Sequence, residues 1–482
     1  MNKIYTEENY QEMIQRLFQR FPSFQKSGAS AYKPGIANME FADQLMGHPH
    51  RKYKIIHVAG TNGKGSVSNM LASVLASSGK KVGLYTSPHI LDFRERMRVV
   101  QDGRPPMLIS QREVWDFVCK WQDTFDHIDM SFFEITTIMA LDWFAAQQVD
   151  VVVLETGLGG RLDSTNIVSP ALCVITNIGL DHCDMLGETL PEIAFEKAGI
   201  IKPNVPVVVG ESHPDIDAVF ERKVLYTNLP EPMFMGNRTA MMSLLVFADK
   251  VSPSLWDDRD EILAGMDLRG DYQRKNLRTV LAALDVISGP MKPLGEIGLE
   301  NVKEAIMATA SRTGFHGRWE KVSDDPCVIC DIGHNEHGLK YNFAQLENMK
   351  REGRCSELII VYGSVADKDV DAVLHLMPSD ATYIFTQAQG KRALPAQEAC
   401  DRYLAFCAEW GREVQQGRDR DVQGCRVYVE ADVRSAVAKA VAIAQNAGVS
   451  QGPSEDSAPL IYIGGSTYVV SEAVEYLAEL KQ

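Results

Sequence analysis

Short apolar runs alternate along this chain with segments whose apolar residues recur at helical spacing. In the first 300 residues the apolar runs predict strands at Lys54–Ala59, Val82–Tyr85, Val149–Leu154, Leu172–Thr176 and Val205–Val209. Between them, one helical face of segment 66–78 carries Val67, Met70, Leu71, Val74 and Leu75. Segment 132–147 shows the same spacing. The alternation predicts a mostly parallel sheet with helices on both faces.

The pattern pauses between residues 225 and 270 and then returns. The pause is rich in Met, Pro and Asn, and we interpret it as surface strands and turns; a helix is expected at Tyr272–Ile287. Later strands are predicted at Cys327–Asp331, Leu358–Tyr362, Thr382–Thr386, Val427–Val429 and Leu460–Ile463. The polar segment 449–458 predicts a loop before the last of them. With a boundary near 300–317, we expect two α/β domains, 1–312 and 313–482.

Length, composition and charge narrow the class of protein. At 482 residues, 45% of them hydrophobic, the chain is too long for one ordinary domain and can form substantial cores. Acidic residues outnumber basic ones, 64 against 49, and the formal charge of −15 argues against a nucleic-acid-binding protein. The longest apolar runs are too short for a membrane span. With nine sparse cysteines and no secretory leader, we expect a cytoplasmic protein that binds neither nucleic acid nor membrane.

The strongest chemical signal is the glycine-rich turn HVAGTNGKGS at residues 57–66, which joins a predicted strand to a predicted helix. Main-chain N–H groups of such a turn form an anion-binding concavity, to which the helix N-terminus adds positive potential. Lys64 would place a charge on the β- and γ-phosphates, and the Ser66 hydroxyl would bind Mg²⁺. The spacing departs from the general P-loop pattern, and a lone GxxG would favour an ordinary βα turn. The lysine, the serine and the strand–turn–helix context favour phosphate binding.

Two further motifs follow apolar strands. Glu155 ends the strand of VDVVVLETGLGGRLDSTN, where a carboxylate faces the ligand crevice of an α/β sheet and suits Mg²⁺; the alternative is a helix cap or loop carboxylate. His182 follows the next strand and is expected to reach the same crevice. Thr189 and Glu192 form a capping box that begins a short helix carrying Lys197. By residue pattern alone, such a histidine is usually structural and such a lysine is usually a solvated charge.

The remaining candidates are weaker. Cys327 and Cys330 form a CxxC, but they point to opposite faces of a predicted strand and lack a second pair, so a zinc site is not expected. Asp331 ends that strand and points toward a ligand crevice. Arg318 lies at the proposed domain junction, where it could reach a nucleotide or cap a helix.

These motifs, in this order, resemble the Mur ligase superfamily and, within it, the folylpolyglutamate synthase and dihydrofolate synthase family. The resemblance covers nearly the whole chain and is specific as a set, although single elements are not. It rests on residues 31–35 (AYKPG), 57–66, 85–89 (YTSPH), 94–96, 154–166, 175–182, 195–202, 270–276 (GDYQRKN), 316–320, 331–335, 365–368, 392–395 and 465–467. One departure is visible: the family often has DGAHNP where this chain has DIGHNE at 331–336.

The resemblance implies a P-loop ATPase domain with a folate-binding region and a smaller, Rossmann-like C-terminal glutamate ligase domain, with ATP between them. The implied catalytic residues are Lys64, Lys197, His182 and His334. The implied nucleotide-binding residues are Gly63, Lys64, Gly65, Ser66, Asn276, Arg318 and Asp331. The implied ligands of Mg²⁺, which would occupy two sites, are Ser66, Ser87, Glu155 and His182. Lys197 matches a lysine that the family converts with CO₂ to a carbamate.

The expected function is an ATP-dependent amide ligase that acts through an acyl phosphate. It would add L-glutamate to dihydropteroate, to the γ-carboxylate of reduced folates, or to both, and we expect a monomer. A peptidoglycan Mur ligase is the runner-up, disfavoured by segments 85–89 and 31–35. A regulatory or transport P-loop NTPase would hydrolyse ATP without glutamate. A dinucleotide-binding protein is disfavoured by Lys64 and Ser66. The sequence does not decide which folate reaction takes place.

Overall fold

A computed structural model of the chain describes residues 4–20, 35–228, 241–298, 300–409, 414–416, 425–451 and 458–481. The chain divides into two compact units. The first comprises Met1–Asp267 and Gln273–Phe315, and the second comprises Leu268–Tyr272 and His316–Gln482. None of the described helices combines the length and apolar character needed to cross a membrane. Residues 31–34 of the segment AYKPG lie outside the described residues.

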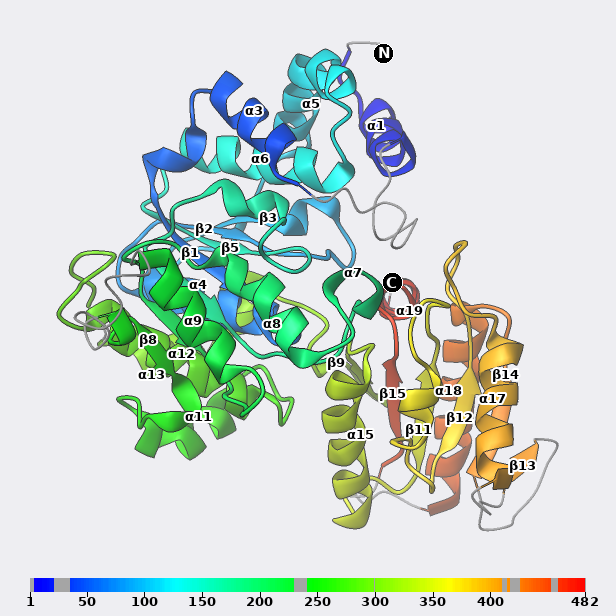
Figure 1. Cartoon of the computed structure of the whole chain (residues 1–482). Coiled ribbons are helices and arrows are strands. Elements are labelled where there is room, and N and C mark those ends of the chain that lie inside the picture. Colours follow the sequence, from blue (N-terminus) through cyan, green and yellow to red (C-terminus); the bar gives the residue numbers. More distant parts are fainter. Residues whose placement is uncertain are drawn as a thin grey trace. The chain divides into compact units, whose positions relative to one another are not determined.

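A sheet of eight described strands, ordered β4-β3-β2-β5-β1-β6-β7-β8, forms the centre of the first unit (Figure 1). The strands from β2 to β8 in this order are parallel, whereas β3 runs antiparallel to both β2 and β4. Their bounds are β1 Lys54–Ala59, β2 Val82–Tyr85, β3 Met97–Val100, β4 Met107–Leu108, β5 Val151–Glu155, β6 Leu172–Ile175, β7 Val207–Val209 and β8 Leu245–Phe247.

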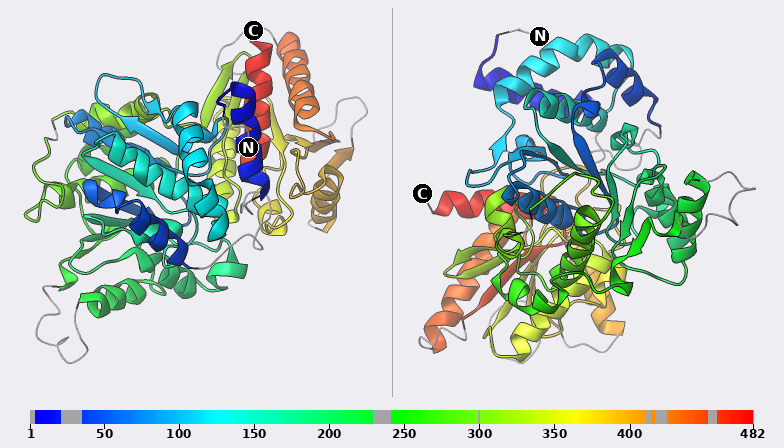
Figure 2. Two further views of the ribbon diagram at one scale, coloured as in Figure 1. Left: turned by 90° about the horizontal axis from the view of Figure 1, so that it is seen from above. Right: turned by 90° about the vertical axis from the view of Figure 1, so that its left-hand side faces the viewer.

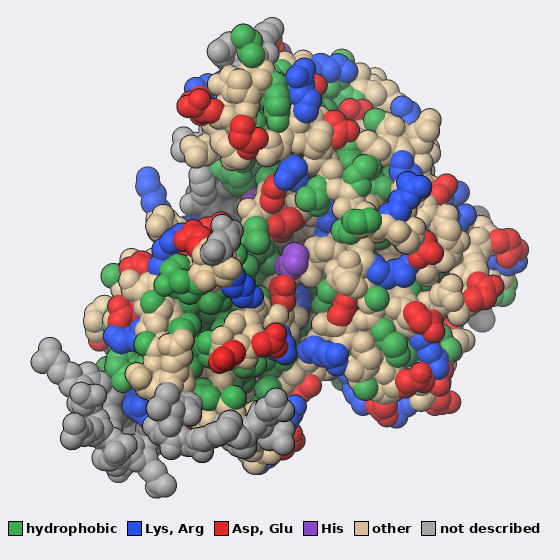
Figure 3. All heavy atoms as spheres, turned by 180° about the vertical axis from the view of Figure 1, so that it is seen from behind, with side chains coloured by type: hydrophobic (Ala, Val, Ile, Leu, Met, Phe, Trp, Pro, Cys, Tyr) green, Lys and Arg blue, Asp and Glu red, His purple; other side chains and the backbone are tan. Residues whose placement is uncertain are grey.

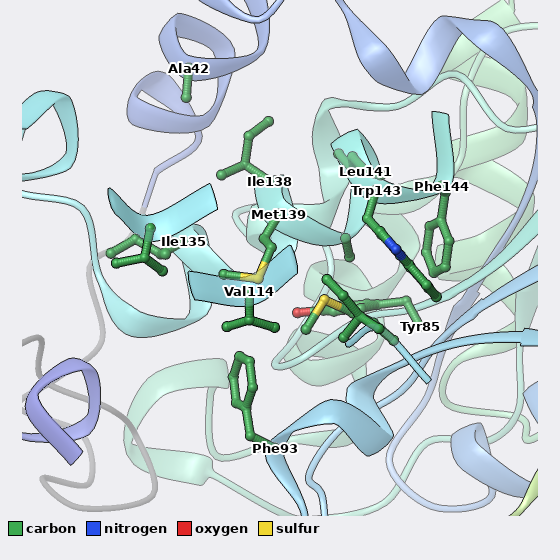
Figure 4. Close-up of a cluster of buried hydrophobic side chains, with 14 of the residues drawn as sticks. Ala42, Tyr85, Phe93, Val114, Ile135, Ile138, Met139, Leu141, Trp143 and Phe144 are labelled. Carbon is green, nitrogen blue, oxygen red and sulfur yellow. The ribbon is translucent and has the colours of Figure 1, made fainter. Parts of the chain in front are cut away.

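Helices cover both faces of this sheet. On one face α4 contacts β1, β2 and β5, and α12, α13 and α14 pack in turn on α4. On the other face α5 and α6 bury Val114, Ile135 and Met139 against Tyr85 of β2 (Figure 4). The helices are α1 Glu7–Arg20, α3 Ala37–Leu45, α4 Lys64–Ser77, α5 Gln111–His127, α6 Phe132–Ala146, α7 Cys183–Leu186, α8 Leu190–Lys197, α9 Asp217–Asn228, α11 Arg259–Gly265, α12 Gln273–Ser288, α13 Val302–Met307 and α14 Thr309–Thr313.

The second unit has a sheet of seven described strands in the order β13-β14-β12-β11-β15-β10-β9, parallel except for β9. Helices α18 and α19 contact each other and one face of the sheet (Figure 2), and α15 and α17 contribute side chains to the core on the other. The bounds are β9 Glu320–Asp324, β10 Cys327–Cys330, β11 Leu358–Tyr362, β12 Thr382–Phe385, β13 Val414–Gln416, β14 Cys425–Val429, β15 Leu460–Gly464, α15 Glu336–Arg351, α16 Asp371–Leu374, α17 Ala396–Glu409, α18 Val433–Gln451 and α19 Thr467–Leu480.

The predicted fold class is confirmed, and each predicted strand is present within two residues at either end. Two predictions are wrong in part. Residues 259–265, expected among surface strands and turns, form helix α11, whose first turn carries Asp260 and Glu261 where acidic side chains favour a helix N-terminus. Residues 449–451, expected in a loop, continue α18, while 452–457 lie outside the described residues. The short strands β3, β4, β9 and β13 were not predicted, whereas β8 lies in the segment where surface strands were expected.

A buried polar chain links β1 to the loop that follows β5. The Thr165 hydroxyl donates its single proton to Asp163 Oδ1, so its oxygen accepts from His57 Nε2 at 2.8 Å. His57 is therefore the neutral Nε2–H tautomer, and its buried Nδ1 has no hydrogen-bond partner among the described residues. Burial, with a smaller effect from Lys202, lowers the pKa of His57 from 6.5 to about 3. The folded protein thus keeps this imidazole neutral well into the acidic range.

This depressed pKa predicts a pH-dependent loss of stability. Below about pH 6.5 the unfolded chain binds a proton at His57, whereas the folded chain does not. This difference lowers the free energy of unfolding by up to about 1.4 kcal/mol for each unit that the pH falls. His57→Gln, which retains a donor near Thr165, should flatten that slope between pH 6.5 and 4. Urea-unfolding midpoints of both proteins across this range provide the test. Parallel curves for the two proteins would contradict the assignment.

Candidate active site

The turn after β1 is shaped for an anion. Strand β1 ends at Ala59 and α4 begins at Lys64, with Gly63 as its N-cap at φ +82°. No side chain caps α4, so the N–H groups of its first turn remain directed at the space in front of the helix. A Cβ on Gly63 would lie 2.2 Å from Asn276 Oδ1, which shows how closely α12 approaches the turn. The structure thus brings Gly63, Lys64, Gly65 and Ser66 together with Asn276, as the sequence predicted for a nucleotide site.

Residues following β6 hold this turn in place. The main-chain N–H of Thr61 donates to Asn177 O at 3.0 Å, and that of Asn62 donates to Asn177 Oδ1 at 2.9 Å. The Thr61 hydroxyl donates to Gly179 O at 3.1 Å. Sequence reasoning did not single out Asn177, although it lies in the motif ITNIGLDH. The feature that could have identified Asn177 is the one that identified Glu155: a polar residue at the carboxyl end of an apolar parallel strand.

Two lysine side chains reach one main-chain oxygen in this turn. Lys64 Nζ donates to Gly60 O at 3.0 Å and to Thr61 O at 3.1 Å, and Lys197 Nζ donates to Gly60 O at 2.9 Å. Lys197 is only 4% exposed. Burial and the neighbouring Lys64 charge lower its pKa to about 7, although Asp181 and Asp163 oppose the shift. Lys197, at the end of α8, is therefore buried against the turn of residues 60–63, here called the phosphate turn. The residue pattern of α8 did not reveal this burial.

The predicted metal ligands lie at the ends of neighbouring strands. Glu155, the last residue of β5, is 2% exposed, and its Oε2 accepts from the main-chain N–H of Ser87 at 3.2 Å. Ser66 is buried at the start of α4, where its Oγ accepts from Gln273 Nε2 at 3.2 Å. His182 follows β6 in a left-handed conformation, with Nε2 3.8 Å from the Asp181 carboxylate. A hydrogen bond thus links Ser87 directly to Glu155. Gln273, which contacts Ser66, is a further residue of the site that the sequence did not identify.

The chemistry of these donors suits a hard divalent cation. They comprise a buried carboxylate, two hydroxyl groups and one imidazole, and Mg²⁺ prefers oxygen ligands supplemented by substrate phosphates. No cluster of three or more His, Cys, Asp or Glu side chains in the described residues is arranged to hold a metal ion. A metal here would therefore depend on the hydroxyl groups and on oxygens of a bound nucleotide.

In the second unit, Asp331 organises the loop after β10. Its Oδ2 accepts from Tyr272 OH at 2.7 Å and from Trp319 N at 2.8 Å, and its Oδ1 accepts from Gly333 N at 2.7 Å and Asn342 Nδ2 at 2.8 Å. Asp331 is 2% exposed. The carboxylate therefore ties together three segments of this unit. Sequence reasoning missed Tyr272 and Asn342 as its partners.

The two other predicted residues of this unit lie on the segments that Asp331 holds. Arg318 directly precedes Trp319, and its Nη1 donates to Gly317 O at 3.1 Å. His334 directly follows Gly333, and its Nδ1 lies 3.1 Å from Ile332 O, which makes Nδ1 the donor nitrogen. The remaining predicted residues belong to the first unit.

Two family models match the chain. The Mur ligase middle domain matches residues 58–209, which include the phosphate turn, Glu155, His182 and Lys197. The Mur ligase glutamate ligase domain matches residues 317–449 of the second unit.

Known proteins resemble the chain over most of its length. The dihydrofolate synthase/folylpolyglutamate synthase of Bacillus subtilis is 33% identical over 395 residues, which cover 79% of this chain and 87% of that protein. The crystal structure of Mycobacterium tuberculosis folylpolyglutamate synthase with ADP and AMPPCP is 25% identical with a TM-score of 0.75, covering 98% of this chain and 99% of that one. The Yersinia pestis bifunctional folylpolyglutamate synthase/dihydrofolate synthase, complexed with AMPPNP and Mn ion, has the same fold, with 23% identity, a TM-score of 0.72 and 98% coverage of each chain. This chain belongs to the dihydrofolate synthase/folylpolyglutamate synthase family of the Mur ligases.

Proposed function

We propose that this ligase uses ATP to join the α-amino group of L-glutamate to a carboxylate of dihydropteroate, of a reduced folate, or of both, acting as a monomer. The observation that carries the proposal is the meeting of Lys64 and Lys197 at Gly60 O, beside the uncapped start of α4. The Lys64 ammonium and the N–H groups at the start of α4 give this turn the positive potential that suits the polyphosphate of ATP. The relatives support folate as the substrate class, because they are named dihydrofolate synthase and folylpolyglutamate synthase. One of them forms complexes with ADP and AMPPCP, which supports a nucleotide site.

We assign the ATPase domain, with its folate-binding region, to residues 1–312 and the glutamate ligase domain to residues 313–482. In the first region, Gly63, Gly65 and Asn276 would surround the phosphates together with Lys64 and Ser66. In the second, Arg318 and Asp331 would contact the nucleotide and His334 would assist the reaction. The four hydrogen bonds of Asp331 indicate that it also sets the positions of the segments carrying Arg318 and His334.

Ser66, Ser87 and Glu155 would hold Mg²⁺ with the nucleotide phosphates, and His182 would serve a second cation. The Yersinia pestis relative, complexed with AMPPNP and Mn ion, supports a metal ion that binds together with a nucleotide. When bound, Mg²⁺ would neutralise charge on the phosphoryl group during its transfer.

The reaction needs activation because a carboxylate would have to expel oxide if an amine attacked it. Transfer of the γ-phosphoryl group of ATP to a carboxylate oxygen gives an acyl phosphate and ADP. The neutral α-amino group of glutamate then attacks the acyl carbon, the C–N bond forms, the bond to phosphate breaks and the amine loses a proton. The Lys64 ammonium and the first N–H groups of α4 would stabilise charge on the transferring phosphoryl group.

Lys197 would carry a carbamate in the active enzyme. Only a neutral amine attacks CO₂, and with a pKa of about 7 roughly half of the Lys197 side chains are neutral near pH 7. The ammonium first loses one proton; the Nζ–C bond then forms as the neutral amine loses a second proton, which leaves an anion near Asp163 and Asp181. A nearby cation would then balance the negative charge of the carbamate. The Lys64 ammonium, which donates to the same Gly60 O, is one such cation.

Replacing Lys64 tests the proposed function. Lys64→Ala should reduce ATP-dependent ligation of glutamate by at least about 1,000-fold, because the transferring phosphoryl group loses its fixed cation. Product formation from dihydropteroate or tetrahydrofolate, followed chromatographically, is the measurement. Lys81→Ala is a matched control, since Lys81 also donates to a main-chain oxygen, Gln147 O, but lies at the far end of β2. Wild-type turnover in folded Lys64→Ala would exclude this role.

Carbamylation of Lys197 makes a second prediction. With dissolved CO₂ held constant, incorporation of ¹³CO₂ into the wild-type protein should rise between pH 6 and 8, because the neutral amine becomes more abundant above its pKa of about 7. Nuclear magnetic resonance should show a ¹³C carbamate signal that is missing from Lys197→Arg. A signal of equal size in both proteins, or none in the wild type, would refute carbamylation at this residue.

A further inference from the structure

Helix α14 lies just before the chain leaves the first unit at Phe315, and a buried arginine holds its end. Arg98, in β3, is 2% exposed. Its Nη1 donates to Thr313 O at 2.8 Å and to Gly314 O at 2.9 Å. The last carbonyl groups of a helix have no partners within the helix, so a cation that donates to them satisfies them and complements the helix dipole. Arg98 therefore fixes the C-terminal end of α14 against the sheet.

The other end of α14 is held by Asp267, the last residue before the chain passes into the second unit at Leu268. Asp267 Oδ1 accepts from Ala310 N at 2.9 Å, and Oδ2 accepts from Ser311 N at 2.9 Å. A carboxylate on the first N–H groups of a helix acts as a cap. Helix α14 thus joins two places, Asp267 and Phe315, from which the chain continues into the second unit.

Arg98 also reaches the loop that carries a predicted metal ligand. Its Nη2 donates to Thr86 Oγ1 at 2.8 Å, and the N–H of the next residue, Ser87, donates to Glu155 Oε2 at 3.2 Å. Burial lowers the pKa of Arg98 to about 10, and the charges of Glu95 and Glu155 oppose that shift, so the guanidinium is protonated at neutral pH. One side chain therefore contacts both the Ser87 loop and the end of α14.

We propose that Arg98 is a positioning residue for ligation: by donating both to Thr86 and to the last carbonyl groups of α14, it fixes the hydrogen-bonded pair Ser87 and Glu155 relative to α14. The inference rests on the proposed function, in which Ser87 and Glu155 hold Mg²⁺ together with the nucleotide. Because a misplacement of about 1 Å can reduce a rate by about 100-fold, a clamp of this kind affects turnover more than nucleotide binding. The planar guanidinium group donates to three acceptors, namely Thr313 O, Gly314 O and Thr86 Oγ1, which the single ammonium of a lysine could not reach in the same geometry.

The test combines a substitution at each end of α14 with their double mutant. Arg98→Lys keeps the charge but loses the fork, and Asp267→Asn keeps an acceptor but loses the charge. Ligation is measured at saturating ATP, glutamate and tetrahydrofolate, together with the Kd for ADP and the thermal midpoint. Arg278→Lys is the control, because Arg278 also donates to a main-chain oxygen, Val251 O, but lies away from α14.

Each single substitution should lower kcat about 10-fold while the Kd for ADP changes less than about 3-fold, and Arg278→Lys should leave both unchanged. If the two residues act through one helix, kcat of the double mutant should be about 10- to 20-fold below that of the wild type. Independent effects would multiply and lower kcat about 100-fold. Multiplied losses, unchanged kcat, or a loss of nucleotide affinity equal to the loss of kcat would overturn the inference.

Asp267→Asn keeps the test decisive if Arg98→Lys does not fold, since a normal kcat in that variant alone would overturn the role of α14. If the wild-type enzyme forms no product from any folate substrate, the proposed function fails and the inference falls with it.

Discussion

The candidate active site is built around two lysine side chains that share one main-chain oxygen. Lys64 comes from the turn itself and Lys197 from the end of α8, yet both donate to Gly60 O. Burial and, to a smaller extent, repulsion by the Lys64 charge lower the pKa of Lys197. Either a polyphosphate or a change of charge at Lys197 relieves the repulsion. Nucleotide binding and the proposed carbamylation would both reduce the same local excess of positive charge.

The sheet explains how residues so distant in sequence reach this point. Strands β5, β1 and β6 are adjacent and parallel, so their carboxyl ends meet at one edge. Glu155 ends β5, the phosphate turn follows β1, and Asn177 follows β6. The register pairs Val58 of β1 with Glu155 of β5, which places the carboxylate level with the start of the turn. The buried chain from His57 through Thr165 to Asp163 then stabilises the loop after β5, where Asp163 Oδ2 accepts from the N–H groups of Gly157 and Leu158.

The sequence predicted the parallel strands and the phosphate turn because periodicity and glycine spacing are local properties of the chain. It could not predict burial of Lys197, because α8 presents an ordinary amphipathic pattern and only the packed turn supplies the carbonyl acceptor. It also could not show why Gly333 replaces the alanine that is common in the family. A Cβ at Gly333 would lie 2.9 Å from both Asn342 Nδ2 and Asp331 Oδ1, so an alanine there would require one of these hydrogen-bonded side chains to shift. Helix α11 was missed because its few apolar positions give a weak helical signal.

The net charge of −15 does not conflict with anionic substrates. Acidic and basic side chains are interspersed on the face shown in Figure 3, so the overall sign does not describe any one site. In the proposed reaction, ATP is consumed only when glutamate is joined to a folate carboxylate. Phosphate release from MgATP should therefore require both glutamate and either dihydropteroate or tetrahydrofolate, each offered separately, and should match the amide formed. Equal phosphate release without glutamate, as a regulatory or transport NTPase would show, would contradict the account.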